Sequence, residues 1–362
     1  MSRIGKTIED LNRYGQQWLA ALPGGQPEVS AAACETAQAD PPGLVEIGDF
    51  GPNPGQLRML VHVPQELPAR PALVVVLHGC RQTAQEYDFG TGWSRLAARH
   101  GFILCLPEQP GGNNPQHCFN WFTERNTSRD SGEAGSIASM VAHLSHVHGV
   151  DPRRVFVTGL SAGGAMTAAL LAAYPDVFAA GAVIAGLPFR AAVSVGCALE
   201  VMAHGDRRTD ADAAATVRGA SDHAGPWPRL SVWHGTADMI VTQENATALI
   251  GQWRSLMGLR SAPTREERVD GQIHRVWEDA AGVAQIEDHR LADFGHGAPL
   301  DAGALGQPGP FLIEAGISST LHIAEFFGLI PKPLIPKPLI PKSLIPKPVT
   351  NVLSHVLRAA GV

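Results

Sequence analysis

The feature that most constrains this chain is a repeated alternation of short apolar runs with longer amphipathic stretches. ALVVVLHG (72–79) is a continuous apolar run, typical of a strand buried on both faces of a sheet. LVEIGDF (44–50) and LRMLVHV (57–63) alternate instead, in the manner of paired antiparallel strands. Two such strands followed by strand–helix units predict an α/β fold with a mostly parallel central sheet and helices on both faces. Further strands are expected at 102–107, 154–160, 180–186, 229–235, 273–279 and 285–292, and helices at 91–100, 133–148, 162–174, 243–257 and 318–327.

The strand–helix rhythm divides the chain. We interpret residues 1–42 as an N-terminal arm and 43–328 as the main α/β domain. The rhythm breaks at 187–228, a long Ala-rich segment that we interpret as a candidate lid. Four LIPKP-type pentads (329–348) contain too much proline for a helix or sheet and predict a polyproline-II linker before the C-terminal tail (349–362). This end of the chain is either a simple spacer or a tether that docks on an apolar, anionic surface through its Ile-Pro edges and lysines.

Composition narrows the function classes. The chain has 362 residues, 44% of them hydrophobic and 17% charged, with a mean hydropathy of −0.01, which excludes a disordered, collagen-like or coiled-coil protein. No apolar run approaches the ~18 residues of a membrane-spanning helix. The net charge is −6, and because 329–362 carry five basic and no acidic residues, the remainder holds 23 basic and 34 acidic side chains. This acidic body argues against nucleic acid as a partner.

The pentapeptide Gly159-Leu160-Ser161-Ala162-Gly163 is a G-x-S-x-G motif between a predicted strand and an alanine-rich predicted helix. This is the strand–turn–helix context of a nucleophile elbow, in which the flanking glycines permit a tight turn that exposes the serine hydroxyl. The alternative is that Ser161 only caps the helix. The context favours Ser161 as a catalytic nucleophile.

A serine hydroxyl needs a base, and the base needs an orienting carboxylate. In the chain order Ser…Asp…His, both partners should follow Ser161 at the ends of later strands. Asp238 lies directly after the strand at 229–235, and His296 lies after the strand at 285–292, between two glycines. Either residue alone could be an ordinary surface-loop residue, but together they complete a candidate triad. The competing residues, which lack this placement, are Asp206, Asp210, Asp212, His289 and His322.

A tetrahedral oxyanion needs two preorganised backbone donors. The N–H of Ala162, directly after the nucleophile, is the first candidate. The second should come from the loop His78-Gly79-Cys80-Arg81 after the strand at 72–79, where the N–H of Cys80 is best placed.

Metal and cofactor signals are weak. None of the five cysteines forms a C-x-x-C pair. His143, His146 and His148 cluster near a predicted helix end without carboxylates and are read as a solvated helix terminus. No phosphate-binding loop, dinucleotide fingerprint or basic–aromatic patch is present in the sequence. We therefore expect no cofactor and no metal.

Four segments occur in a recognisable order: HGC (78–80), NNPQHCFNWF (113–122), GLSAGGAM (159–166) and WHGTADMIVTQENA (233–246). Together they resemble the polyhydroxybutyrate (PHB) depolymerase family of esterases, members of the α/β-hydrolase superfamily that are similar to feruloyl and acetylxylan esterases. The resemblance covers roughly 57–296. It implies an α/β-hydrolase fold and a serine esterase that cleaves polyhydroxyalkanoate chains, their oligomers or related esters through an acyl-enzyme. Ser161, Asp238 and His296 fall on the family's triad positions.

The resemblance also implies a disulfide between Cys80 and Cys118 that would fix the oxyanion loop. Such a bond suits an oxidising, extracellular or periplasmic compartment, whereas the N-terminus has no recognisable signal peptide, which makes the cytoplasm the default expectation. Trp121 and Phe122 are either ester-pocket residues or plain core aromatics.

Three functional alternatives remain open at this point. The first is a feruloyl, acetylxylan or short-chain carboxylesterase. The second uses the same elbow for acyl transfer to an alcohol or sugar. The third is a binding role, in which the tail targets polyester granules and catalysis is incidental. The leading hypothesis is hydrolysis of polyhydroxyalkanoate or hydroxybutyrate esters on a Ser-His-Asp triad.

Overall fold

The computed structural model describes residues 43–269 and 272–331. The expected arm (1–42) and tail (349–362) lie outside these ranges, as does the pentad repeat from residue 332 onward. Leu329 and Ile330, which begin the repeat, pack against a buried apolar cluster. Within the described ranges, no helix combines the length and the apolar character needed to cross a membrane.

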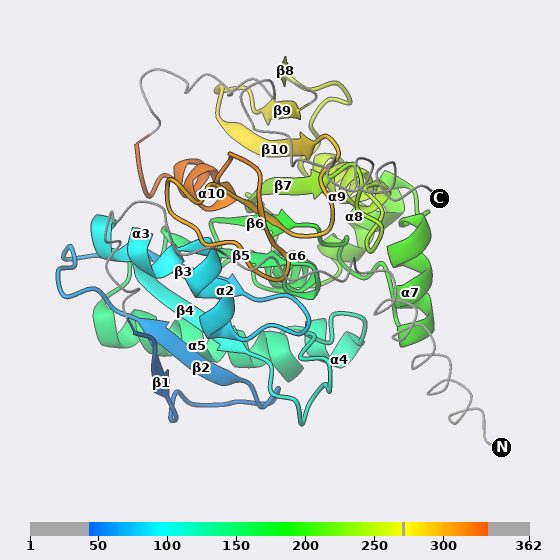
Figure 1. Cartoon of the computed structure of the whole chain (residues 1–362). Helices are drawn as coiled ribbons and strands as arrows, with labels where there is room; N and C mark the ends of the chain where they lie inside the picture. Colours follow the sequence, from blue (N-terminus) through cyan, green and yellow to red (C-terminus); the bar gives the residue numbers. More distant parts are fainter. Residues whose placement is uncertain (1–42, 270–271, 332–362) are drawn as a thin grey trace, which may run out of the picture. The chain divides into compact units, whose positions relative to one another are not determined.

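A ten-stranded sheet organises the described residues (Figure 1). In chain order its strands are β1 (Val45–Ile47), β2 (Arg58–His62), β3 (Leu73–Leu77), β4 (Ile103–Glu108), β5 (Val155–Leu160), β6 (Ala180–Ile184), β7 (Arg229–Gly235), β8 (Arg265–Val269), β9 (Gln272–Glu278) and β10 (Ala284–Leu291). Their order across the sheet is β1-β2-β4-β3-β5-β6-β7-β10-β9-β8. The stretch from β4 to β10 is parallel, and antiparallel strands extend the sheet at both ends.

The apolar runs become central strands because both faces of the sheet are covered. Along β3, Leu73, Val75 and Leu77 enter one buried cluster, and Val74 and Val76 enter the other. Successive strand side chains point to opposite faces, so a strand between two helical layers needs an apolar residue at every position.

Helices cover the two faces of the sheet (Figure 1). One layer contains α5 (Gly132–His148), α6 (Ala162–Ala173), α8 (Asp210–Arg218) and α9 (Glu244–Met257). The opposite layer contains α2 (Ala84–Thr91), α3 (Trp93–His100) and α10 (Ser319–Phe327). The remaining elements are α4 (Glu124–Thr127), α7 (Val195–His204) and a two-stranded parallel sheet of β11 (Ala298–Leu300) and β12 (Leu312–Glu314).

Several local elements differ from the sequence expectations. The helix expected at 91–100 is α3, and α2 before it was not expected; Gly92, in a left-handed conformation with φ of 73°, separates the two helices. The signal for α2 is a capping box, in which Thr83 and Glu86 each bond the other's backbone N–H. The charged edge strand β8 was not expected either, since REERV carries little apolar signal.

The candidate lid at 187–228 contains two helices that the sequence did not predict. α8 packs beside α9, where Gln252 bonds the backbone of Phe189 and of Ala213. α7 is more exposed, with only Ala198 fully buried along its length. The segment is therefore anchored at α8 and presents α7 to solvent.

Candidate active site

Ser161 sits at the sharp turn between β5 and α6. Its backbone has φ of 56° and ψ of −115°, a conformation that costs free energy for a residue with a side chain. The turn is held by hydrogen bonds from Ser161 N to Ile184 O (2.8 Å) and from Ala165 N to Ser161 O (2.9 Å). Ser161 makes no side-chain capping bond to the helix, so the structure does not support the purely capping role.

The two glycines of the pentapeptide are required by packing. A Cβ on Gly159 would lie 2.5 Å from the carbonyl of Gly163, and one on Gly163 would lie 2.5 Å from the carbonyl oxygen of His78. Real Cβ atoms do not approach so closely. The elbow is thus pressed against the end of β3, which brings the nucleophile turn next to the predicted oxyanion loop.

His296 lies between Ser161 and Asp238. Its Nε2 is 2.9 Å from Ser161 Oγ, and its Nδ1 is 2.7 Å from Asp238 Oδ2. When Nδ1–H donates to the carboxylate, Nε2 is free to accept from the serine hydroxyl. The side chains of His296 and Asp238 are 6% and 0% exposed, so the pair is shielded from water. Of the three residues predicted from strand ends, His296 is therefore within hydrogen-bond distance of both others.

Asp238 is held ionised by its neighbours. Burial opposes its ionisation, but hydrogen bonds from His234 and His296 outweigh burial and hold its pKa well below the usual range. Its second oxygen, Oδ1, accepts from the backbone N–H groups of Ile240 and Val241, both at 2.9 Å. The carboxylate is thus fixed in orientation as well as charge.

His234 is the site residue that the sequence reasoning missed. Its Nε2 lies 2.8 Å from Val241 O and 3.2 Å from Asp238 Oδ2. Both neighbours are acceptors, so Nε2 carries the proton and contacts the same carboxylate oxygen as His296. The sequence feature that could have identified His234 is its position four residues before Asp238, near the end of β7.

The loops that carry Asp238 and His296 are joined to each other. Ala237 N donates to Phe294 O (3.0 Å), and Thr236 N donates to Leu291 O (2.9 Å). A Cβ on Gly235 would lie 2.1 Å from Phe294 O, so glycine is needed where the two strand ends meet. This close approach of β7 and β10 sets the distance between the carboxylate and the imidazole.

The predicted oxyanion loop is fixed from several sides. The disulfide Cys80–Cys118 is present, and Arg81 N donates to Gln116 O (2.7 Å). Gln82 accepts from Gly79 N (2.9 Å) and donates to Pro310 O (2.9 Å). In the described part of the chain, no hydrogen bond takes up the N–H of Cys80 or of Ala162. Both donors are available for a ligand.

His78 supports this loop from beneath. The ring is fully buried, with Nδ1 2.7 Å from Gly79 O and Nε2 3.1 Å from Gln109 N. Nδ1 therefore donates and Nε2 accepts, which defines a neutral tautomer. Burial lowers the pKa of His78 to about 4, so the ring stays neutral in the folded protein near neutral pH.

A buried carboxylate orders the segment that carries Trp121 and Phe122. Glu133 accepts from Gln109 Nε2 (2.6 Å), from Asn120 N (2.8 Å) and from Asn120 Nδ2 (2.6 Å). Burial raises the pKa of Glu133, while these hydrogen bonds oppose that shift. The network fixes the backbone directly before Trp121.

An apolar cluster adjoins the nucleophile. Trp121 and Ala162 belong to it, with Phe122 partly buried against it and its ring 5.7 Å from the Trp121 ring. We call this set of side chains the acyl-side cluster; its other members are Ala165, Leu187, Ala192, Ala198 and Val241, with Cys80, Cys118, Val201, Met202 and Ile240 packed against it.

The competing residues are engaged elsewhere. Asp206 pairs with Arg208 (2.6 Å), Asp210 pairs with Arg254, and Asp212 accepts from Thr209 (2.7 Å). The His289 ring stacks on Trp233 at 3.7 Å, and His322 lies near both.

Comparisons with known proteins identify relatives of this chain. A sequence model of the family described as Esterase PHB depolymerase matches residues 59–274. Poly(3-hydroxyalkanoate) depolymerase C of Paucimonas lemoignei is 40% identical over 332 residues, which is 90% of this chain and 79% of that protein. Feruloyl esterase B of Talaromyces funiculosus is 31% identical over 271 residues, 72% of this chain and 75% of that protein.

Two acetylxylan esterases are similar as well. The enzyme of Coprinopsis cinerea is 35% identical over 272 residues, 71% of this chain and 69% of that protein. Among solved structures, the acetyl xylan esterase from Aspergillus awamori matches with a TM-score of 0.68 and 26% identity, covering 80% of this chain and 100% of that one.

Proposed function

The chain belongs to the Esterase PHB depolymerase family, and from this premise we propose that it hydrolyses hydroxyalkanoate esters, polymeric or oligomeric, through an acyl-enzyme on Ser161. The fold is that of the α/β-hydrolases, and the chain is a carboxylic ester hydrolase. The substrate and the residue roles are the proposal.

The first half of the reaction acylates the serine. Ser161 Oγ attacks the ester carbonyl carbon while its proton passes to Nε2 of His296. The N–H groups of Cys80 and Ala162 stabilise the oxyanion that forms. As the tetrahedral intermediate collapses, the carbon–oxygen bond to the alcohol breaks, and His296 returns the proton to the leaving oxygen.

The second half repeats the sequence with water. His296 removes a proton from water, the resulting hydroxide attacks the acyl carbonyl, and the bond to Ser161 Oγ breaks. The acid leaves, and the serine regains its proton from His296. Asp238 stays ionised throughout and holds the imidazole in its tautomer.

One observation carries this proposal. Ser161 Oγ, the His296 ring and Asp238 Oδ2 form a continuous chain of contacts of 2.9 and 2.7 Å, with His296 and Asp238 shielded from water. No ordinary structural role requires a serine with a strained backbone, an imidazole and an ionised buried carboxylate in that order.

The surroundings of Ser161 favour an aliphatic polyester. Such a chain offers apolar area and regularly spaced carbonyls, and the acyl-side cluster supplies apolar surface beside the nucleophile. We assign Trp121 and Phe122 to the wall of this acyl site. The domain is proposed to span 43–328, with α7 of the 187–228 segment lying over the substrate.

Replacing the nucleophile tests the mechanism. Ser161→Ala should lower kcat on p-nitrophenyl butyrate on the order of 10⁴-fold or more, while Ser145→Ala on α5 should leave it unchanged. Quenching wild type during turnover of a hydroxybutyrate oligomer should reveal a covalent adduct on Ser161 by mass spectrometry. Activity of Ser161→Ala within about tenfold of wild type would remove Ser161 from the mechanism.

A rate comparison tests the substrate. We expect kcat/KM to be higher on hydroxybutyrate oligomers and amorphous polymer than on methyl ferulate or acetylated xylan. Adding an alcohol acceptor should leave the free acid as the main product, whereas dominant acyl transfer would favour the transferase alternative. Deleting 329–362 and measuring granule co-sedimentation tests the proposed tether, because unchanged binding would discard it.

A further inference from the structure

Three potential metal ligands, none of them assigned to catalysis, meet at one place on the sheet. His274 is on β9, and Glu287 and His289 are on β10. One ligand atom from each lies within 4.8 Å of the others. His274 and His289 are directly opposite each other in the antiparallel register, and Glu287 precedes His289 by two residues, which places it on the same face.

The two imidazoles have unmet bonding capacity. In the described ranges, Nε2 of His274 and Nε2 of His289 are buried and make no hydrogen bond. Glu287 Oε2 lies 3.5 Å from His289 Nε2, which is beyond a good hydrogen bond. Buried polar atoms without partners cost free energy, so a pair of them facing one carboxylate needs an explanation.

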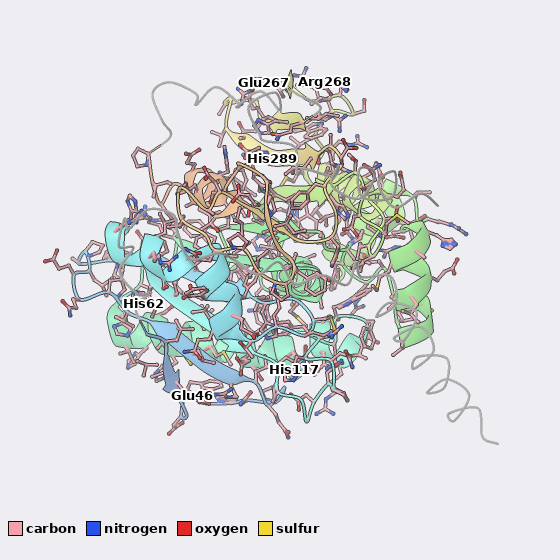
Figure 2. All side chains as sticks on the ribbon, viewed as in Figure 1. Glu46, His62, His117, Glu267, Arg268 and His289 are labelled. Carbon is pink, nitrogen blue, oxygen red and sulfur yellow. A yellow bond between two sulfur atoms is a disulfide. The ribbon has the colours of Figure 1, made fainter. Side chains whose placement is uncertain are left out.

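Packing orients the group. Figure 2 labels His289 on β10; its ring lies between Trp233, at 3.7 Å, and His274, at 4.2 Å. His322 of α10 lies 6.1 Å from His289, and its Nδ1 is 3.9 Å from Glu325. A metal ligand is normally held by such neighbours, which limit the rotation of the ring.

We propose that His274, Glu287 and His289 bind one divalent transition-metal ion, with Zn²⁺ the best match. Two imidazoles and one carboxylate are a ligand set that Zn²⁺ accepts, leaving a fourth position for water or for His322. The His274 and His289 rings are nearly parallel, 13° apart, so binding requires His274 to turn about its side-chain bonds. The partial exposure of His274 permits that rotation.

Two arginines near the proposed site limit its affinity for a metal ion. Arg229 interacts electrostatically with Glu287, and Arg265 interacts electrostatically with His274. Both guanidinium groups repel a bound cation, so the two imidazoles must supply most of the affinity for the metal ion. The ion would join β9 to β10 and so brace the antiparallel edge of the sheet.

The sequence could not indicate this site. His274 and His289 are fifteen positions apart, and only the antiparallel register brings them face to face. The expectation of no metal came from cysteine spacing and from the histidines of α5, neither of which bears on β9 and β10.

The test uses the full-length chain without a histidine tag, stripped with EDTA and dialysed. Titration with ZnCl₂ by calorimetry should give one ion per chain, and Co²⁺ should give the visible absorption of a low-coordinate site. Saturating Zn²⁺ should raise the unfolding temperature, because an ion that binds only the folded state stabilises it.

Variants locate the site. His274→Gln and Glu287→Gln should each weaken Zn²⁺ binding about tenfold or more, and His274→Gln/His289→Gln should abolish it. His143→Gln/His146→Gln, on α5, is the matched control and should bind as wild type does. Should the double variant fail to fold, the two single variants decide. Absence of stoichiometric binding to wild type, or equal binding by wild type and His274→Gln, would overturn the proposal.

Discussion

Nε2 of His234 lies 3.2 Å from Oδ2 of Asp238, the same oxygen that bonds the imidazole of His296. One carboxylate oxygen therefore serves two imidazoles, while its other oxygen accepts two backbone N–H groups. Four donors around one buried carboxylate keep it ionised and prevent it from turning. His234 is thus a positioning residue, acting on the proposed catalytic pair without contacting Ser161 in the hydrogen bonds described.

His234→Phe should lower kcat about ten- to a hundredfold with little change in KM, because a hydrogen bond to a charged group contributes about 1.5–3 kcal/mol. His234→Gln, whose amide can replace the Nε2 donor, should recover part of the loss. Steady-state kinetics on p-nitrophenyl butyrate checks this, with His100→Phe, an exposed histidine of α3, as the control. Equal losses in the Phe and Gln variants would point to packing rather than to the donor.

A second prediction concerns the close approach of β7 and β10. Gly235→Ala should lower kcat about a hundredfold and destabilise the fold by about 1–3 kcal/mol, because its Cβ would meet Phe294 O at 2.1 Å and displace the loop that carries His296. Thermal unfolding and kcat are the measurements.

The control lies in the same loop. A Cβ on Gly295 meets nothing within 4 Å, so Gly295→Ala should retain the stability and activity of wild type. If Gly295→Ala is as damaging as Gly235→Ala, the loop requires glycine for flexibility and not for space between the strand ends.

The fold class was predictable because buried parallel strands appear in the sequence as unbroken apolar runs, as in β3. The family was predictable because four motifs occur in the order typical of that family. The pair Asp238 and His296 was also accessible, since parallel strands end at one edge of the sheet and both residues follow a strand directly. The structure brings them within 2.7 Å of each other.

Other features depend on contacts that the sequence does not record. His234 lies near the end of β7, and His78 directly follows β3, but only the folded chain shows that the His234 ring turns toward Asp238. α7 and β8 escaped prediction because α7 buries little and β8 is charged along its length. The apolar periodicity that predicts a helix or strand comes from the residues it buries, so an element that buries few residues has no clear periodic pattern in the sequence.

A third prediction concerns α7. Val193, Val195 and Leu199 expose apolar side chains in or just before this helix, while its Val201 and Met202 pack against the acyl-side cluster. Met202 O accepts from Thr242 N (2.8 Å), which ties the end of α7 to the loop that follows Asp238. Met239 in that loop is 92% exposed. An insoluble polyester would contact this apolar surface before an ester enters the site.

Leu199→Glu should therefore lower the hydrolysis rate of suspended polymer about five- to tenfold, the loss expected from about 1 kcal/mol of apolar contact. Its rate on p-nitrophenyl butyrate should stay within about twofold of wild type, because Leu199 is outside the acyl-side cluster. Val147→Glu, an exposed apolar residue at the end of α5, is the matched control. Equal loss on both substrates would place Leu199 in the acyl site itself.

The last prediction follows from the buried neutral ring of His78. Its pKa is lowered to about 4 in the folded chain, whereas an unfolded histidine takes up a proton near pH 6.5. Below about pH 6.5 the unfolded state binds more protons, so this residue makes the free energy of unfolding fall as the pH drops toward about 4, by about 3 kcal/mol in total. His274 acts in the same direction. Asp88 acts oppositely, because burial raises its pKa to about 6.

Because Asp88 opposes His78, the test is a difference between two proteins. His78→Asn should be less stable than wild type at pH 7, and the gap should shrink steadily as the pH falls to about 4.5, since the variant has no ring to protonate on unfolding. Urea unfolding at several pH values measures both curves. His146→Asn removes an exposed histidine of α5 and should run parallel to wild type. If His78→Asn also runs parallel to wild type, His78 takes up its proton without unfolding, and the ring beneath the oxyanion loop is not locked in its neutral form.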